Sequence, residues 1–179
     1  MGLINLFRKY ENRPRIKIAP TAFDIIIDGI SFVLLLLMLF AVFQNYADLP
    51  NLVPSHFGAD GLADEYGNKM VVWLLPSIGI LIFIGSIILN NFPHKFNYLV
   101  AITKENAKQQ YAIGTRIVRF SNLFVMAIFF YISNKTINIA LQKSEASLNA
   151  WFSPTIIIVT LVGLVAIVIF SVLKNKKGR

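Results

Sequence analysis

The chain has 179 residues, is 56% hydrophobic and only 15% charged, and contains no cysteine. This composition is too apolar for an ordinary soluble domain, and the missing cysteines exclude disulfides, thiolate metal ligands and a thiol nucleophile. Although the net charge is +8, no basic patch alternates with exposed aromatic residues, so we predict a membrane protein with no nucleic-acid partner.

Four apolar segments are long enough to cross a hydrocarbon layer of about 30 Å as helices. They lie at residues 23–46, 70–89, 120–140 and 151–173. The first is too long for a cleaved signal sequence and has no small-residue cleavage pattern, so we expect residues 1–22 to be a retained basic segment. Residues 174–179 form a basic tail. We predict an all-α membrane protein: one domain (residues 23–173) of four transmembrane helices, with a structured extracellular loop and a cytoplasmic juxtamembrane helix.

The distribution of lysine and arginine predicts the orientation of the chain. Basic residues gather before the first span, between the second and third, and after the fourth, whereas only Lys69, Lys135 and Lys143 fall in the remaining regions. The positive-inside rule then places both termini and residues 90–119 in the cytoplasm, and residues 47–69 outside. We expect a multi-pass protein of a bacterial plasma membrane, with the lipid bilayer as its first partner.

Two acids lie at the start of the first span. Asp24 and Asp28 are four residues apart and share one helical face. Acids at membrane depth are costly and are often functional, so proton or ion coupling is one interpretation. The favoured one is interfacial ion pairing with Arg116 and Arg119 at the start of the third span.

The loop at residues 47–69 is the strongest candidate for a functional site. A plain connector between spans needs neither its prolines and glycines nor its charged side chains. We predict a compact extracellular structure that serves either as a cap on the helices or as a recognition surface. The candidate residues are Pro50, Pro54, His56, Phe57, Gly61, Asp64 and Lys69.

Neither a metal site nor catalysis is predicted in this loop. His56, Asp60 and Asp64 suggest metal ligands, but the chain's other histidine, His94, is expected on the opposite membrane face. Ser55 and His56 are neighbours, and neighbouring side chains of an extended segment point in opposite directions. We therefore expect no catalytic residue, no cofactor and no enzyme activity.

The later segments are predicted to pack and to turn. Pro76 is expected to kink the second span. Thr103 is predicted to cap a polar helix that runs straight into the third span, with one face carrying Ala107, Tyr111, Gly114 and Val118. In the fourth span, the small residues Gly163 and Ala166 would permit self-association.

The order and spacing of the loop residues, set between a first and a second span, resemble the bacterial membrane domain of unknown function 1648. The residues that carry this resemblance are Leu49, Pro50, Pro54, His56, Phe57, Gly61, Asp64 and Lys69. That domain also forms the N-terminal part of SdpI-type immunity proteins against the sporulation-delaying toxin. A cytoplasmic motif that resembles a second stretch of some members includes Phe96, Asn97, Glu105, Asn106, Gln110 and Tyr111. The resemblance covers residues 46–119. SdpI-type relatives, which are usually longer, confer resistance to a secreted peptide toxin and hold a transcriptional repressor at the membrane.

Two hypotheses about function follow. The first is a non-enzymatic recognition or immunity protein, in which the outer loop meets an extracellular peptide or toxin and the cytoplasmic helix contacts a regulator. The second is a metal- or ion-handling membrane protein that uses His56 with the loop acids, or Asp24 and Asp28.

Overall fold

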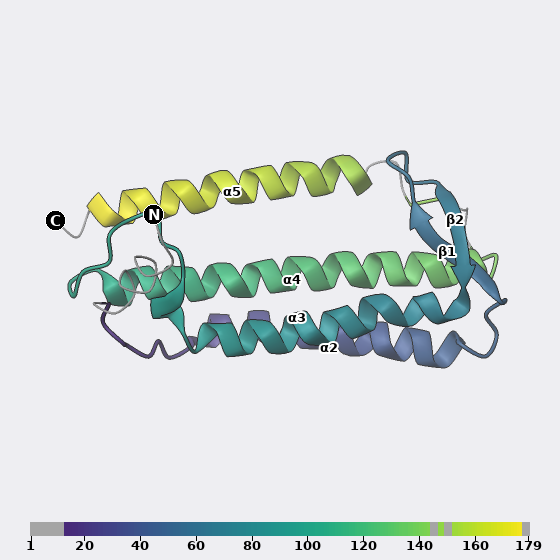
Figure 1. The fold of residues 1–179 in the computed structure, drawn as a ribbon, viewed down its shortest axis with the longest axis horizontal. Helices are drawn as coiled ribbons and strands as arrows, with labels where there is room; N and C mark the ends of the chain where they lie inside the picture. Colours follow the sequence, from purple (N-terminus) through teal and green to yellow (C-terminus); the bar gives the residue numbers. More distant parts are fainter. Residues whose placement is uncertain (1–12, 144–146, 149–151, 177–179) are drawn as a thin grey trace, which may run out of the picture.

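Four long helices lie side by side, and a small β-hairpin closes one end of them (Figure 1). The structure is a computed structural model and describes residues 13–143, 147–148 and 152–176. We call the end with the β-hairpin the hairpin end, and the opposite end, where residues 91–106 lie, the loop end. The elements are α2 (Ala22–Asn45), β1 (Leu52–Phe57), β2 (Ala63–Asn68), the 3-10 helix η1 (Lys69–Trp73), α3 (Leu74–Asn90), the 3-10 helix η2 (Pro93–Lys95), α4 (Ala107–Ala140) and α5 (Phe152–Lys176).

Within the described residues, three helical segments are long and apolar enough to cross a membrane. They are Ala22–Asn45, Lys69–Asn90 and Ala107–Ala140, and they correspond to the first three predicted spans. The predicted fourth span coincides with α5, whose apolar described part, Phe152–Val165, is shorter. The chain is therefore a helical membrane protein with three candidate spans, and the fourth span stays a prediction.

A reciprocal cap starts α2. The hydroxyl of Thr21 accepts from the backbone N–H of Asp24 at 3.3 Å, and the Asp24 carboxylate accepts from the Thr21 N–H at 2.9 Å. This capping box satisfies two of the amide groups that the first turn leaves unpaired. Further along, Met38 and Val42 are fully buried whereas Phe43 is 76% exposed, so one face of α2 packs inward and the other would face lipid.

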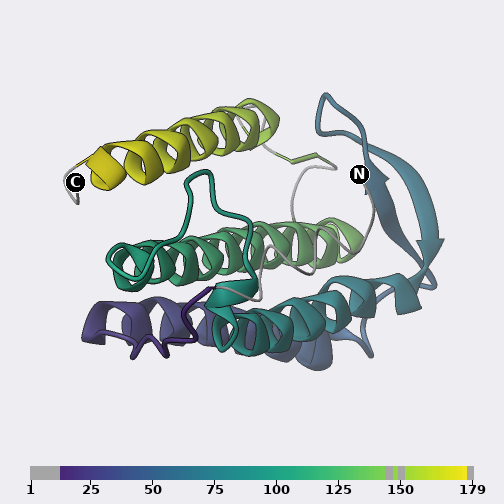
Figure 2. The ribbon, with the colours of Figure 1, turned by 60° about the vertical axis from the view of Figure 1, so that its left-hand side comes forward.

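The core lies between α2, α3 and α4 (Figure 2). At mid-length, Leu35 and Met38 of α2 pack against Met126 of α4. Nearer the hairpin a second cluster joins β1 to the helices; its buried members are Val42, Leu49, Val53, Val72 and Ile137. The β-hairpin is thus part of the same packed unit as the helices.

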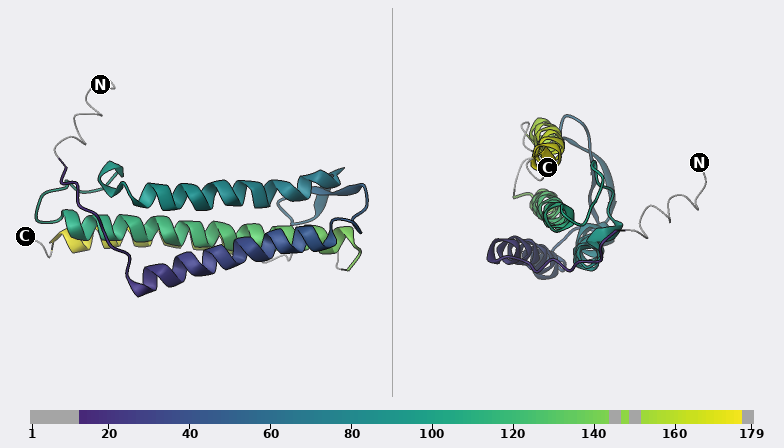
Figure 3. Two further views of the ribbon diagram at one scale, coloured as in Figure 1. Left: turned by 90° about the horizontal axis from the view of Figure 1, so that it is seen from below. Right: turned by 90° about the vertical axis from the view of Figure 1, so that its left-hand side faces the viewer.

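α5 makes few contacts with the other helices and lies along α4 (Figure 3). Its first residue, Phe152, stacks on Tyr131 of α4 with the ring centroids 4.6 Å apart. Beyond that stack the described residues of α5 are mostly exposed. Spaces therefore remain between α5 and the rest of the molecule.

One prediction about these elements needs correction. The all-α class is wrong in one respect, because residues 52–68 form a two-stranded antiparallel sheet. Pro76 lies in the first turn of α3, where a missing N–H loses no α-helical hydrogen bond, and the kink predicted there stays a prediction. The second span is divided between η1 and α3.

The predicted continuous helix is confirmed, with a later start. α4 begins at Ala107 and runs unbroken for 34 residues to Ala140. Thr103 caps only a preceding turn, in which its hydroxyl and the Asn106 side chain each accept from the other residue's N–H, at 3.4 and 2.8 Å. Of the predicted apolar face, Ala107, Tyr111 and Gly114 are buried.

Candidate functional site at the hairpin end

The β-hairpin includes residues that disfavour strands, Pro54 in β1 and Gly67 in β2. β1 pairs with β2 in antiparallel register, with Leu52 opposite Asn68 and Phe57 opposite Ala63, and irregularities follow Pro54. In the connecting turn the Asp60 carboxylate accepts from the Leu62 N–H at 3.0 Å. Gly61 takes a positive φ of 81°, and an added Cβ would lie 3.0 Å from the Leu148 carbonyl. Only glycine fits both conditions easily.

The base of the hairpin is fixed to the helices. Val53 of β1 is fully buried in the cluster that contains Val42 and Ile137. The Lys69 ammonium group lies 4.8 Å from the centre of the Tyr46 ring and donates to the Tyr46 carbonyl at 3.4 Å. Lys69, predicted as a site residue, therefore joins the end of the hairpin to the end of α2, and its described contacts are structural.

His56 and Asp64 form a cross-strand pair on the surface of the hairpin. His56 Nδ1 lies 2.7 Å from Asp64 Oδ1, although the two side chains are 61% and 49% exposed. The hydrogen bond to Asp64 raises the pKa of His56, and the negative charges of Asp64 and Glu65 add to this effect. Protonation of His56 therefore changes the charge of an exposed polar pair at the hairpin end of the molecule.

The other predicted loop residues are distributed between surface and interior. Pro50 is exposed, Phe57 is half-buried, and Pro54 and Gly61 are buried. The Asp60 carboxylate accepts from the Leu62 N–H in its turn and, like the Asp64 carboxylate, lies beside Gly58. Among the residues that the structure describes, no group of three or more His, Asp or Glu side chains could hold a metal ion.

A cavity of about 340 Å³ lies beneath the hairpin. Its walls come from β1, η1, the start of α3, the outer part of α4 and the start of α5, which meet at the hairpin end of Figure 1. His56 of β1 lines one side, and Ser133 and Thr136 of α4 line another. The Ser133 hydroxyl is buried and has no hydrogen-bond partner among the described residues. A buried polar group without a partner is unusual and costly.

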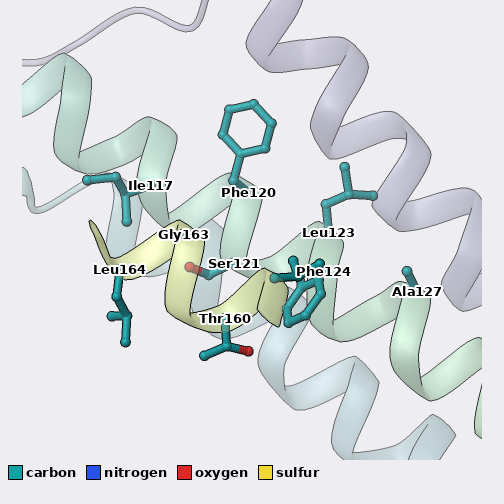
Figure 4. Close-up of a pocket in the computed structure, with 10 residues that line it drawn as sticks. Ile117, Phe120, Ser121, Leu123, Phe124, Ala127, Thr160, Gly163 and Leu164 are labelled. Atoms are coloured by element: carbon teal, nitrogen blue, oxygen red, sulfur yellow. The ribbon is translucent and has the colours of Figure 1, made fainter. Parts of the chain in front are cut away.

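A second, larger hollow of about 620 Å³ lies between α4 and α5, and Figure 4 shows its lining. Phe120, Leu123 and Phe124 come from α4, and Gly163 and Leu164 come from α5. Its lining is almost wholly apolar, and the hydroxyl of Thr160 already donates to the Ile156 carbonyl at 2.7 Å. An apolar groove of this kind is a packing gap between the two helices that a hydrocarbon chain could fill.

The ion pairs predicted at the loop end are confirmed. Arg116 Nε lies 2.9 Å from Asp24 Oδ1, and Arg119 Nε lies 2.9 Å from Asp28 Oδ2. Both acids of α2 are thus paired with α4. Asp24 also completes the cap of α2, so it has two structural roles.

The motif predicted for the cytoplasm is partly assembled. Arg13 donates to the Phe96 and His94 carbonyls at 2.7 and 3.1 Å, and the Tyr111 hydroxyl donates to the Pro14 carbonyl at 3.0 Å. Phe96 stacks on Tyr98, which packs in turn on Tyr111. The residues before α2 are therefore attached to the loop end through Phe96 and Tyr111.

The remaining members of the motif are spread out. Gln110 is 1% exposed, and its amide nitrogen has no partner among the described residues. Asn106 belongs to the turn before α4, whereas Asn97 and Glu105 are exposed. A hydrogen bond from Thr103 lowers the pKa of Glu105.

Sequence reasoning missed the polar side chains on the buried face of α4. Asn122, Ser133 and Thr136 point inward, at 3%, 3% and 7% exposure. Their separations of eleven and three residues keep them on one side of an α-helix. That spacing, in an otherwise apolar span, is the pattern that would have identified them.

The comparisons with known proteins concern the hairpin region. Residues 33–80 match the family model described as "Domain of unknown function (DUF1648)". The match includes the second half of α2, the whole hairpin, η1 and the first turns of α3, and it confirms the predicted family for this segment. It ends before the motif of residues 96–111. No curated protein and no solved structure matches the chain.

Proposed function

We propose that this membrane protein, whose residues 33–80 form a DUF1648 domain, is a non-enzymatic recognition protein of the immunity type. Its β-hairpin would lie outside the membrane and bind an extracellular peptide. The proposal rests on two grounds: the polar side chains on the surface of the hairpin, and the resemblance to SdpI-type immunity proteins.

The observation that carries the proposal is the exposed His56–Asp64 pair on a firmly anchored hairpin. The hairpin's own packing is provided by Val53 and by Lys69, which lie at its base. Neither partner of the pair is buried, and exposed pairs of this kind contribute little to stability. A rigid scaffold that presents polar side chains with no core role is the usual arrangement of a binding surface.

Ion handling, the second hypothesis, has less support. The inward polar residues of α4 are an observation in its favour, since polar side chains inside a bundle often mark ion pathways. However, Asp24 and Asp28 are each paired with an arginine. Between them and Ser133 lies the apolar cluster of Leu35, Met38 and Met126, whose members are at most 4% exposed. A continuous polar path is not formed by the described residues.

Survival of cells that produce the protein tests the proposal. A sensitive bacterial host would be challenged with purified sporulation-delaying toxin, and we expect the wild-type chain to protect it. His56→Ala and Asp64→Ala should remove protection while the protein still accumulates in the membrane. Asp48→Ala is the matched control, because Asp48 is an exposed acid of the same loop that lies outside the pair.

Two results would contradict the proposal. One is full protection by both pair variants, which would show that the pair is not part of the surface that matters. The other is loss of protection that follows the amount of protein in the membrane, which would give the hairpin a purely structural role. Membrane levels therefore have to be measured for every variant, by quantitative blotting of the membrane fraction.

A further inference from the structure

We propose that the loop end binds the phosphate group of an anionic phospholipid through a basic cluster formed by Arg15, His94 and Lys95. The inference goes beyond the proposed function and does not depend on it, because the cluster lies at the opposite end of the molecule from the hairpin. The ligand is defined by its chemistry: a phosphate without a compensating positive charge, attached to acyl chains.

The cluster is assembled by hydrogen bonds that fix the residues before α2. Arg13 donates to two carbonyl groups at η2, one of them that of His94 at 3.1 Å. The Tyr111 hydroxyl of α4 donates to the Pro14 carbonyl at 3.0 Å. Arg15 is the next residue and is exposed. Its guanidinium therefore extends from a backbone that is held beside η2.

The charge around η2 is positive. Lys95 ends η2 and is exposed, and His94 before it is half-buried. Burial lowers the pKa of His94, and the positive charges of three side chains lower it further: Arg15, Lys95 and Arg13. In the described residues 13–21 and 91–106, Glu105 is the one acid, and its carboxylate already accepts a hydrogen bond from Thr103. A group of cations with so little negative charge nearby attracts an anion.

The position of the cluster relative to α3 favours a lipid over a soluble anion. The candidate span that contains α3 ends at Asn90, and η2 follows after two residues. Phe92 between them is 42% exposed, and the Lys95 ammonium group lies 4.9 Å from the centre of its ring. Aromatic rings and long basic side chains gather where a membrane meets water. Ile84 and Ile88 share one face of α3 and are 50% and 54% exposed, so acyl chains have an apolar surface in the turns before the cluster.

The chemistry of the cluster selects the headgroup. A phosphate oxygen accepts charge-assisted hydrogen bonds from guanidinium and ammonium groups, and the imidazole adds a further N–H donor. In phosphatidylglycerol the phosphate carries the only charge. In phosphatidylcholine a quaternary ammonium group follows the phosphate and would be repelled by the cluster. The site should therefore prefer phosphatidylglycerol.

Native mass spectrometry of the delipidated full chain in detergent measures this preference. We expect phosphatidylglycerol to bind about tenfold more tightly than phosphatidylcholine, because basic side chains at a membrane surface each favour anionic lipid. Arg15→Gln and Lys95→Gln should each weaken the binding of phosphatidylglycerol by about fivefold, and the double variant more than either. The weak binding of phosphatidylcholine should not change. Arg13 is kept in all variants, because its hydrogen bonds hold the segment before α2.

Lys104→Gln combined with Lys108→Gln is the matched control. Both lysines are exposed at the same end, and neither is among the charges that shift the pKa of His94. This variant loses the same amount of positive charge as the double variant of the cluster, and we expect it to keep its affinity for phosphatidylglycerol. Circular dichroism checks that every variant is folded.

The titration of His94, followed by NMR in lipid nanodiscs, gives a readout at the cluster itself. A bound phosphate places a negative charge beside the imidazole, so the pKa of His94 should be higher in phosphatidylglycerol than in phosphatidylcholine. His56 lies at the other end of the molecule and reports the general effect of the charged surface. The increase at His94 should exceed the increase at His56, and the excess should disappear in the double variant of the cluster.

Four results would overturn the proposal. Equal affinity for the two lipids would show that the cluster does not select the headgroup. An equal loss of binding in the lysine control would reduce the effect to a general attraction between a basic surface and anionic lipid. Displacement of phosphatidylglycerol by the same concentration of inorganic phosphate would assign the cluster to a soluble anion. An equal increase of pKa at His56 and His94 would show that no phosphate lies at the cluster.

Discussion

The two histidines of the chain lie at opposite ends of the molecule and in opposite electrostatic environments. His56 has a carboxylate partner, which raises its pKa above the ordinary 6.5. Burial lowers the pKa of His94, and the positive charges of Arg15, Lys95 and Arg13 lower it further. A group with a raised pKa stabilises the folded protein fully below about pH 6.5, and this contribution is lost as pH rises through the folded value.

We expect a titration followed by NMR to separate the two imidazoles, with His56 losing its proton at the higher pH. In Asp64→Asn the pKa of His56 should fall toward 6.5, because the hydrogen-bonded negative charge is gone, while that of His94 stays unchanged. Binding that needs the protonated pair would weaken as pH rises through the pKa of His56. An unchanged His56 pKa in Asp64→Asn would show that the pair does not form.

Gly114 gives a second prediction for a single residue. A Cβ at this position would lie 2.9 Å from the Tyr98 hydroxyl oxygen and 3.0 Å from the Phe96 ring. Tyr98 cannot move away freely, because its hydroxyl donates to the Pro93 carbonyl at 2.9 Å. Gly114→Ala should therefore lower the stability by about 1–3 kcal/mol through overpacking.

Thermal unfolding in detergent, followed by circular dichroism, measures this effect. Gly85→Ala is the matched control, because Gly85 is also inside a helix but its added Cβ would meet nothing within 4 Å. We expect the control to be neutral or slightly stabilising, since alanine favours a helix by up to about 1 kcal/mol over glycine. Equal stability of the two variants would show that the Tyr98 cluster is loosely packed.

At the scale of the elements, the contact between α2 and α4 is fixed by charge at one end and by apolar packing along its length. Arg119 is 9% exposed at its side chain and Asp28 is 34% exposed, so neither is fully solvated. Breaking a buried pair costs about 3–5 kcal/mol, and the exposure of Asp28 reduces this to about 1–3 kcal/mol here. Asp28→Arg and Arg119→Asp should each destabilise the protein by that amount.

The double charge swap should recover most of the loss, because it restores an opposite-charge pair between the same two helices. Stability in detergent is the measurement. Lys108→Asp changes the charge of α4 by the same amount at an exposed position, so it controls for effects of charge on membrane insertion. A double variant no more stable than either single one would show that the 2.9 Å contact does not hold the helices together.

Elements that show a local sequence pattern could be predicted, whereas elements that form only through packing between distant segments could not. Long apolar runs and paired charges are local, so the spans and the partners of Asp24 and Asp28 were predictable. The β-hairpin was not, because Pro54, Gly61 and Gly67 disfavour strands and only packing of Val53 against the helices outweighs them. The cavity was also hidden, since its walls come from five separate elements.

At the scale of the whole molecule, α4 runs from the loop end to the hairpin end and contributes residues to the candidate sites at both ends. Its 34 residues, at about 1.5 Å each, give a length of about 50 Å, more than a bilayer core requires. The same helix carries Tyr111 in the aromatic cluster at the loop end, Arg119 in the ion pair, and Ser133 at the cavity. A ligand bound in the cavity at the hairpin end would therefore contact the element that also forms the loop end.

This arrangement makes sense for recognition across a membrane only if the hairpin and residues 91–106 lie on opposite sides of it. Because the chain has no cysteine, single cysteines can report their side in intact cells. Asp60→Cys in the hairpin turn should react with a membrane-impermeant maleimide added outside, and Lys104→Cys should react only after the cells are permeabilised. The excess of basic residues at the loop end is the physical reason for this expectation.

The same method decides whether α5 crosses the membrane. Lys143→Cys lies just after α4 and Lys174→Cys near the end of α5, so a spanning α5 places them on opposite sides. We expect the first to be labelled in intact cells and the second only after permeabilisation. Labelling of both from outside would mean that α5 lies along the membrane and the chain has three spans. The cavity beneath the hairpin would then lose the fixed wall that Phe152 now provides.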